Sequence, residues 1–180
     1  MKKFDRKIYL SPPHLNGSEI NYLQNALKSN YIAPVGPSID DFEKKITKYL
    51  NRSFGLALSS GTAALHLALR VLEVKKDDYV FCSDLTFVAS ANVIKYLNAT
   101  PIFIDSDFES WNMCSKSLEK AFKNYSPRAV IVTDIYGQSA NYKEIVEICD
   151  KYRTPIIEDS AESLGAQYYE NKCGSFGEIS

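Results

Sequence analysis

Short runs of apolar residues alternate with longer segments of mixed character from residue 54 to the end of the sequence. Five of these runs are mostly apolar on both faces of an extended chain and end in polar or small residues, which is typical of central parallel strands. They are Phe54–Leu58, Val80–Ser83, Pro101–Asp105, Ala129–Thr133 and Pro155–Glu158. The pattern therefore predicts five buried strands.

The segments between these runs have the length and the periodicity of helices. They are Thr62–Leu72, Val88–Leu97, Ser117–Lys123 and Asn141–Tyr152. In the last segment Ile145, Ile148 and Cys149 recur at helical spacing, while charged residues occupy the opposite side. Strands separated by helices predict right-handed βαβ units, so we expect an α/β fold with a doubly wound, mostly parallel central sheet.

Two more helices are expected ahead of the first strand. They cover Ser18–Ser29 and Ser38–Leu50, and the stretch NYIAPVGPS between them is too rich in Pro and Gly to be regular. We therefore expect an N-terminal helical segment over residues 1–50 and part of an α/β domain over residues 51–180.

Composition and charge narrow the class of protein. The chain has 180 residues, 45% of them hydrophobic, and a formal net charge of −1 without a basic stripe, which argues against nucleic-acid binding. No apolar window approaches the length of a membrane span, and the N-terminus lacks the apolar core of a signal peptide. The four cysteines are scattered without CxxC pairs, which favours free thiols in a reducing cytoplasm and predicts no metal site.

The first predicted strand ends at a candidate phosphate site. In an open α/β sheet, ligands bind at the carboxyl ends of the strands. The turn SSGT, residues 59–62, lies at such an end and is followed by a helix. Gly61 allows a close approach of the backbone, while free N–H groups at the helix start and the Thr62 hydroxyl can bind a phosphate. An ordinary helix cap explains the same residues without any ligand.

Two other strand ends carry candidate binding residues. Phe87 follows the second strand and can stack on a flat ring, although a phenylalanine more often packs in the core. The fifth strand ends in Glu158 and Asp159, whose side chains should point in opposite directions, so that one of them can face the ligand crevice. The alternative is a helix cap formed by Asp159, with both carboxylates in solvent.

Together these strand ends describe a phosphate cradle, an aromatic surface and a carboxylate that requires a positive partner. Pyridoxal phosphate combines a phosphate, a flat ring and a ring nitrogen. A carboxylate beside that nitrogen favours its protonated form, and the protonated ring acts as an electron sink for carbanion chemistry. The combination predicts a pyridoxal phosphate site.

Several ordered motifs resemble those of one known family. They are SSGTAALHLAL, DLTFVASANVI, PIFIDSD, YGQ and PIIEDSAESLGAQY, followed by GSFGEIS. In order and spacing they are similar to the DegT/DnrJ/EryC1/StrS sugar-nucleotide aminotransferases, pyridoxal phosphate enzymes of fold type I, and the resemblance covers essentially the whole chain. It implies that Gly61 and Thr62 bind the cofactor phosphate. It also implies that Phe87 stacks on the pyridine ring and that Asp159 pairs with the ring nitrogen.

The same resemblance implies a substrate, an amino donor and an assembly. The substrate is a nucleotide-linked 4-keto-6-deoxy sugar, most similar to the UDP-linked cases, the donor is glutamate, and the full-length protein is a homodimer. Glu162 occupies a place near the cofactor where relatives often have His or Gln. Asp134 stands where many relatives have His, and we expect this departure to affect the substrate side.

The resemblance also implies that part of the family's machinery is missing from these residues. The Schiff-base lysine of the family lies in a motif S-[FY]-N-x-x-K that follows the segment matching GSFGEIS, and this places it beyond Ser180. The C-terminal small domain is absent as well. No catalytic residue is therefore assigned within the 180 residues, and we expect the chain to be inactive by itself.

Three alternatives remain open from the sequence. One is a sugar dehydratase of the same family, in which the lysine is replaced. Another is a metal-dependent glycosyltransferase that uses Asp105 and Asp107 to hold a metal ion and a nucleotide diphosphate. The third is a non-catalytic remnant that retains the phosphate cradle and binds the cofactor only.

Overall fold

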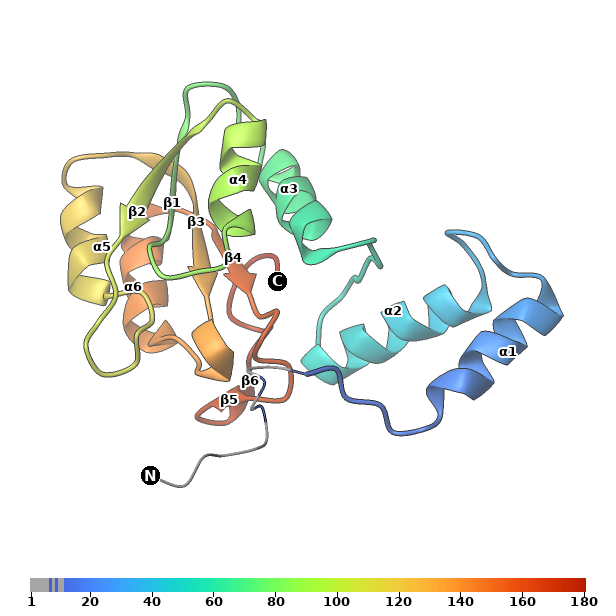
Figure 1. Ribbon diagram of the computed structural model, residues 1–180. Helices are drawn as coiled ribbons and strands as arrows, with labels where there is room; N and C mark the ends of the chain where they lie inside the picture. The colour runs from blue at the N-terminus through green and yellow to red at the C-terminus, as the bar shows by residue number, and fades with distance from the viewer. Residues whose placement is uncertain (1–6, 8, 10–11) are drawn as a thin grey trace, which may run out of the picture.

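A parallel four-stranded sheet forms the centre of the molecule. The computed structural model describes residues 7, 9 and 12–180 (Figure 1). The strands are β1 (Tyr79–Ser83), β2 (Thr100–Ile104), β3 (Pro127–Thr133) and β4 (Ile156–Asp159). Their spatial order is β2-β1-β3-β4, and every neighbouring pair is parallel. This arrangement confirms the predicted α/β class with a parallel central sheet.

Helices cover both faces of this sheet, as Figure 1 shows. The helices are α3 (Gly61–Val71) and α4 (Ala89–Tyr96) on one face, and α5 (Ser115–Phe122) and α6 (Tyr142–Tyr152) on the other. Side chains alternate along β1, so Val80 and Cys82 pack with α3 and α4 while Phe81 packs with α5 and α6. Two hydrophobic cores therefore lie on opposite sides of one sheet, which explains why the strands are apolar on both faces.

The predicted strand Phe54–Leu58 is wrong. These residues form no strand, and the side chains of Phe54, Leu56 and Leu58 are 91%, 65% and 43% exposed. The described residues place no strand beside this segment, so its backbone has no ladder to join. A side-chain hydrogen bond links this segment to α2 (Pro37–Leu50): the Ala57 N–H donates to the Glu43 carboxylate at 2.8 Å.

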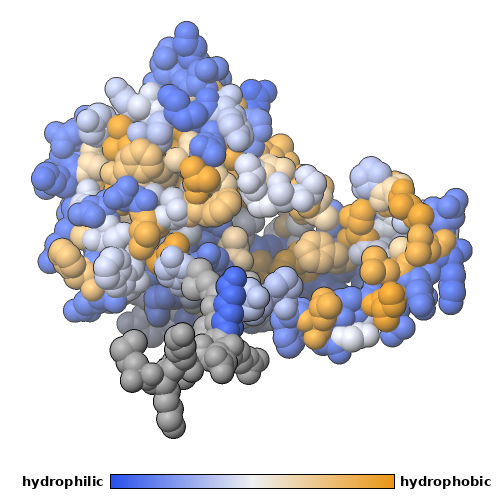
Figure 2. Space-filling view, in the orientation of Figure 1, coloured by the Kyte–Doolittle hydropathy of each residue, from blue (hydrophilic) through white to orange (hydrophobic). Residues whose placement is uncertain are grey.

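The two N-terminal helices, α1 (Glu19–Ser29) and α2 (Pro37–Leu50), extend away from the α/β body (Figure 1). Neither helix has a buried residue. Ile20, Leu23 and Leu27 recur on α1 at helical spacing, and each is more than half exposed. Hydrophobic surface gathers over this part of the molecule in Figure 2. Exposed apolar patches of this kind mark interaction surfaces.

The last described residues run along the free edge of β4. Ile179 forms a parallel bridge with Ile157, and the N–H of Glu158 donates to the carbonyl of Ile179 at 2.9 Å. A short hairpin precedes them, formed by β5 (Gln167–Tyr168) and β6 (Asn171–Lys172). Within the described ranges, every helix is too short or too polar to cross a bilayer.

Candidate functional site

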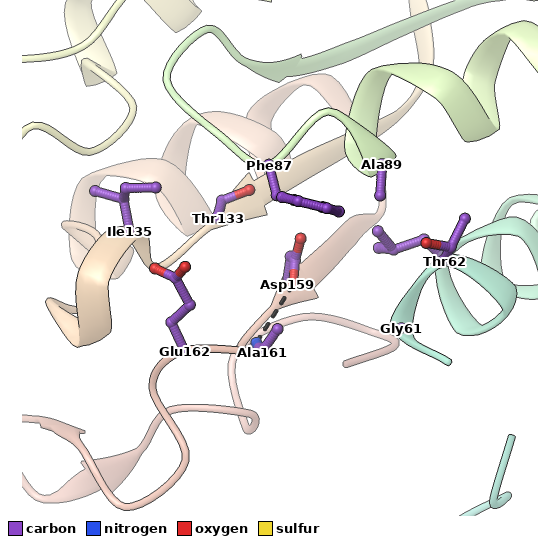
Figure 3. A pocket seen from close by; sticks show the side chains of 10 residues that line it. Gly61, Thr62, Phe87, Ala89, Thr133, Ile135, Asp159, Ala161 and Glu162 are labelled. Carbon is purple, nitrogen blue, oxygen red and sulfur yellow. Dashed lines mark hydrogen bonds between the residues drawn. The ribbon is translucent and has the colours of Figure 1, made fainter. Parts of the chain in front are cut away.

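A cavity of about 250 Å³ opens at the carboxyl ends of β3 and β4 (Figure 3). Its walls come from the start of α3, the loop before α4, the end of β3 and the loop that follows β4. The lining residues are Gly61, Thr62, Leu65, Phe87, Ala89, Thr133, Ile135, Asp159, Ala161 and Glu162. All five residues predicted for cofactor binding, which are Gly61, Thr62, Phe87, Asp159 and Glu162, lie in this one cavity. Their role as cofactor ligands stays a prediction.

The start of α3 presents unused hydrogen-bond donors to the cavity. Ser60 caps the helix, because its hydroxyl oxygen accepts the Ala63 N–H at 3.1 Å. The N–H groups of Gly61 and Thr62 have no acceptor within the described part of the chain. A Cβ placed on Gly61 would meet no atom within 4 Å. Ser60 thus caps the helix, while the N–H groups of Gly61 and Thr62 are available to an anion. There is space for such an anion beside Gly61.

Phe87 forms an aromatic wall of the cavity. Its ring is 71% exposed, and in Figure 3 it extends over the cavity between Thr133 and Ala89, with Asp159 facing it. The more common role of a phenylalanine, packing within the core, does not apply here. An exposed ring at the wall of a cavity is suited to stacking on a flat ligand.

The two acids at the end of β4 point in opposite directions, as the strand periodicity predicts. Glu158 is 1% exposed and faces the protein interior. Its carboxylate accepts the backbone N–H groups of Gly174, Phe176 and Gly177, the last two at 2.7 and 3.2 Å. Burial raises the pKa of Glu158, and these three donors oppose that shift. Glu158 therefore requires no cation.

Asp159 faces the cavity, and no described residue pairs with it as a cation. Its carboxylate accepts the Ser90 hydroxyl at 3.2 Å and the Ala161 N–H at 3.3 Å. Burial raises the pKa of Asp159, and the nearby carboxylates of Glu162 and Asp134 raise it further. No lysine, arginine or histidine belongs to the lining residues named above. The cavity is thus complementary to a cation placed next to Asp159.

Glu162 lines the cavity and also supports the turn that follows β3. Its carboxylate accepts the backbone N–H of Tyr136. Tyr136 lies in the short 3-10 helix η1 (Ile135–Gly137) and has a left-handed φ of 52°, which is uncommon for a bulky residue. Glu162 therefore has a structural contact in addition to its place in the cavity wall.

Asp134 is not among the residues that line the cavity, and its expected effect on the substrate side stays a prediction. It is fully buried, and its carboxylate accepts the Ala140 N–H and the hydroxyls of Tyr142 and Ser163, each at 2.9 Å. Asp134, Glu158 and Cys173 place their ligand atoms within 4.8 Å of one another. The oxygens of both carboxylates already accept backbone N–H or hydroxyl hydrogen bonds, which explains the cluster without an ion.

Asp105 and Asp107 accept hydrogen bonds from backbone N–H groups of their own loop. Asp107 accepts the N–H groups of Glu109 and Ser110 at 2.8 and 2.7 Å, and the Ser110 hydroxyl lowers the pKa of Asp107. Asp105 accepts the N–H of Ser106 at 2.9 Å, and neither acid lines the cavity. These contacts weigh against the glycosyltransferase alternative.

The sequence reasoning missed the polar residues that support Asp159. Thr133 lines the cavity and is paired with Asp159 in the register of β3 and β4. Ser90, on α4, is fully buried and bonds to the Asp159 carboxylate. A signal for Thr133 was present, because it is the last residue of a predicted strand and the carboxyl ends of parallel strands lie at one edge of the sheet.

Comparisons with known proteins agree on one family. Residues 13–180 match the DegT/DnrJ/EryC1/StrS aminotransferase family. The chain is 50% identical over 177 residues to the "Putative pyridoxal phosphate-dependent aminotransferase EpsN" of Bacillus subtilis (strain 168), covering 96% of this chain and 46% of that protein. It is 38% identical over 168 residues to the GDP-perosamine synthase of Escherichia coli O157:H7, covering 93% and 46%.

Solved structures agree as well. The structure of the "Putative sugar aminotransferase Spr1654 from Streptococcus pneumoniae, PLP-form" superposes with a TM-score of 0.87 at 29% identity, over 96% of this chain and 47% of that one. The chain thus spans about half the length of the relatives that it matches.

Proposed function

Because the chain belongs to the DegT/DnrJ/EryC1/StrS aminotransferase family, we propose that it forms the cofactor-binding part of a pyridoxal phosphate-dependent sugar aminotransferase. The observation that carries this proposal is Asp159, a part-buried carboxylate that faces a cavity without a cation. Unused N–H groups and an exposed aromatic ring line the same cavity. Phosphate, flat ring and ring nitrogen of pyridoxal phosphate are the three features that complement these walls.

Each wall has a separate task in this proposal. The N–H groups of Gly61 and Thr62, with the positive end of α3, bind the phosphate. Phe87 stacks on the ring and fixes its plane. Asp159 accepts a hydrogen bond from the ring nitrogen and keeps the proton on it, because an anion next to that nitrogen favours the charged form. When bound, the cofactor supplies an electron sink for proton removal at the substrate carbon.

The names of the relatives support a nucleotide-linked sugar as substrate. One is a GDP-perosamine synthase and another a UDP-4-amino-4,6-dideoxy-N-acetyl-beta-L-altrosamine transaminase. We propose that the whole protein aminates a nucleotide-linked 4-keto-6-deoxy sugar with glutamate as the donor. The exposed apolar faces of α1 and α2 support a homodimer. The four free cysteines support a location in the reducing cytoplasm.

Titration with pyridoxamine 5′-phosphate tests the cofactor assignment on this chain. This compound carries the phosphate, the ring and the ring nitrogen, and it has no aldehyde to react with surface lysines. We expect saturable binding to one site in isothermal titration calorimetry, and binding of pyridoxamine without the phosphate that is weaker by at least about tenfold. A folded chain that binds neither compound would overturn the proposed function.

Substitution of Gly61 by alanine separates ligand binding from folding. The new Cβ meets no protein atom, so the midpoint temperature of thermal unfolding should be unchanged or slightly higher. The same Cβ occupies space that a phosphate requires for close approach to the backbone. We expect the affinity for pyridoxamine 5′-phosphate to fall by about tenfold, and the affinity for phosphate-free pyridoxamine to stay the same. Equal losses for both compounds would contradict a phosphate site at Gly61.

A further inference from the structure

A chain of hydroxyl groups lies behind the Asp159 carboxylate. The Ser90 oxygen is 3.2 Å from the carboxylate oxygen Oδ2 of Asp159 and 3.0 Å from the Thr86 oxygen. The Thr86 oxygen is 2.9 Å from the Thr133 oxygen. Ser90 and Thr133 are 0% and 5% exposed, and Thr86 is partly buried. The chain begins and ends at residues that line the cavity, Thr133 and Asp159.

The charge on Asp159 fixes the direction of every hydrogen bond in this chain. An ionised carboxylate only accepts hydrogen bonds, and each hydroxyl has one hydrogen to donate. Ser90 must therefore donate to Asp159, Thr86 to Ser90, and Thr133 to Thr86. Within the described part of the chain, these three hydroxyls form only the hydrogen bonds just given. With Asp159 ionised, the hydrogen of every hydroxyl in the chain has an acceptor, and the Ser90 hydrogen points at the charged oxygen.

We propose that Ser90 and Thr86 are positioning residues, which hold the Asp159 carboxylate in the orientation and the ionised form that pair with the ring nitrogen of the cofactor. This inference rests on the proposed function. The two residues also connect the walls of the site, because Thr86 precedes Phe87 directly and Ser90 lies in the first turn of α4. The aromatic surface and the counter-ion are thereby fixed to the same segment.

Asp159 depends on these donors because its other neighbours disfavour the charge. Glu162 comes from the loop after β4 and Asp134 from the end of β3, and both raise the pKa of Asp159 together with burial. Glu158 is turned to the other side of β4, and α3 contributes only uncharged residues to the cavity. The donors that oppose the shift are the Ser90 hydroxyl and the Ala161 N–H. Without Ser90, a single donor remains.

Four variants test the proposal without touching the cofactor itself. S90A removes the direct donor, and T86V removes the hydroxyl behind it at nearly constant shape. T86S retains that hydroxyl. T154V is the matched control, since Thr154 is buried and its hydroxyl bonds to the Tyr152 carbonyl, outside the chain of hydroxyls. Thr86 does not line the cavity, so a loss in T86V cannot come from a lost ligand contact.

We expect the affinity for pyridoxamine 5′-phosphate at neutral pH to fall by about tenfold in S90A and about threefold in T86V. The affinity of T86S and T154V should equal that of the wild type. The pH below which binding is lost should move upward in S90A and T86V, because Asp159 then takes up a proton at higher pH. A merely structural role does not move this pH midpoint.

The outcomes distinguish a failure of the role proposed for Ser90 and Thr86 from a failure of the proposed cofactor site. Wild-type affinity and an unchanged pH midpoint in both S90A and T86V would overturn the role of the hydroxyl chain and leave the cofactor site intact. An equal loss in T154V would also overturn it, because the loss would then follow from stability. A wild-type chain that does not bind pyridoxamine 5′-phosphate overturns the proposed function first. If S90A fails to fold, the comparison of T86V with T86S decides.

Discussion

Replacement of Asp159 by asparagine is expected to stabilise the unliganded chain while it lowers the affinity for pyridoxamine 5′-phosphate by about 100-fold. A part-buried carboxylate without a cation destabilises the fold, and repulsion from Glu162 and Asp134 adds to this effect. Asparagine has nearly the same shape, its oxygen can accept the Ala161 N–H, and its amide nitrogen can donate to the Ser90 oxygen. We expect a gain of about 1 kcal/mol in the free energy of unfolding. The affinity falls because the protonated ring nitrogen loses its counter-ion.

The gain in stability depends on pH in a defined direction. The pKa of Asp159 is raised in the folded chain, so the folded state binds this proton more tightly than the unfolded state. The wild type therefore becomes more stable as pH falls through the folded-state pKa, and the advantage of D159N declines until the pH reaches the lower pKa of the unfolded state. Above that pKa the advantage is complete. Urea unfolding at several pH values measures this directly.

Asp105 provides the matched control for this substitution. It is an exposed acid outside the cavity, and among the described residues its carboxylate accepts only the N–H of the following residue. D105N should change neither the binding of pyridoxamine 5′-phosphate nor the pH dependence of stability. If D159N were destabilised at neutral pH and bound the compound as the wild type does, Asp159 would have no role as an unpaired counter-ion.

Replacement of Glu158 by alanine is expected to lower the stability of the fold strongly. The substitution leaves the N–H groups of Gly174, Phe176 and Gly177 without an acceptor in a buried place. Each unsatisfied group is costly, and we expect the free energy of unfolding to fall by about 3–5 kcal/mol. Arg52 holds the same loop from the other side, through the carbonyls of Gly174 and Gly177.

Denaturant unfolding of E158A and of a nearby control measures this effect. Glu178 is an exposed glutamate that accepts one backbone N–H, that of Ile156, at 2.6 Å. E178A should therefore lower the free energy of unfolding by about 1 kcal/mol. A similar small loss in both variants would show that the three donors at Glu158 contribute little to the stability of the fold.

Much of the fold follows from the sequence because the four observed strands carry apolar side chains on both faces of the sheet, even in the edge strand β2, where Phe103 is 53% exposed. Their apolar runs are continuous, and the helices between them begin and end within a few residues of the predicted limits. Phe54–Leu58 has the same apolar character and forms no strand. A strand requires a partner as well as a pattern, and the pattern of a single segment contains no information on whether a neighbouring strand is present.

The candidate site was predictable where it depends on strand ends and not where it depends on contacts across the fold. Phe87 and Asp159 follow strands that the structure contains, and the alternation of β4 correctly separated Asp159 from Glu158. The strand predicted before Gly61 is absent, and Gly61 lies in the cavity because it begins α3. The donors to Glu158 lie 16 to 19 residues further along the chain, in a loop without a regular pattern. The hydroxyl chain joins α4, β3 and β4, so it becomes visible only when the register of the sheet is known.

The protonation state of the bound ring nitrogen tests the central claim most directly. Pyridoxamine 5′-phosphate labelled with ¹⁵N in the ring gives this state from its nitrogen chemical shift, with the free compound at the same pH as reference. We predict a protonated nitrogen in the wild-type chain at a pH where the free compound is deprotonated, and an unprotonated nitrogen in D159N. A bound nitrogen that is unprotonated in the wild type, or equally protonated in both, would contradict the assignment of Asp159 as its counter-ion.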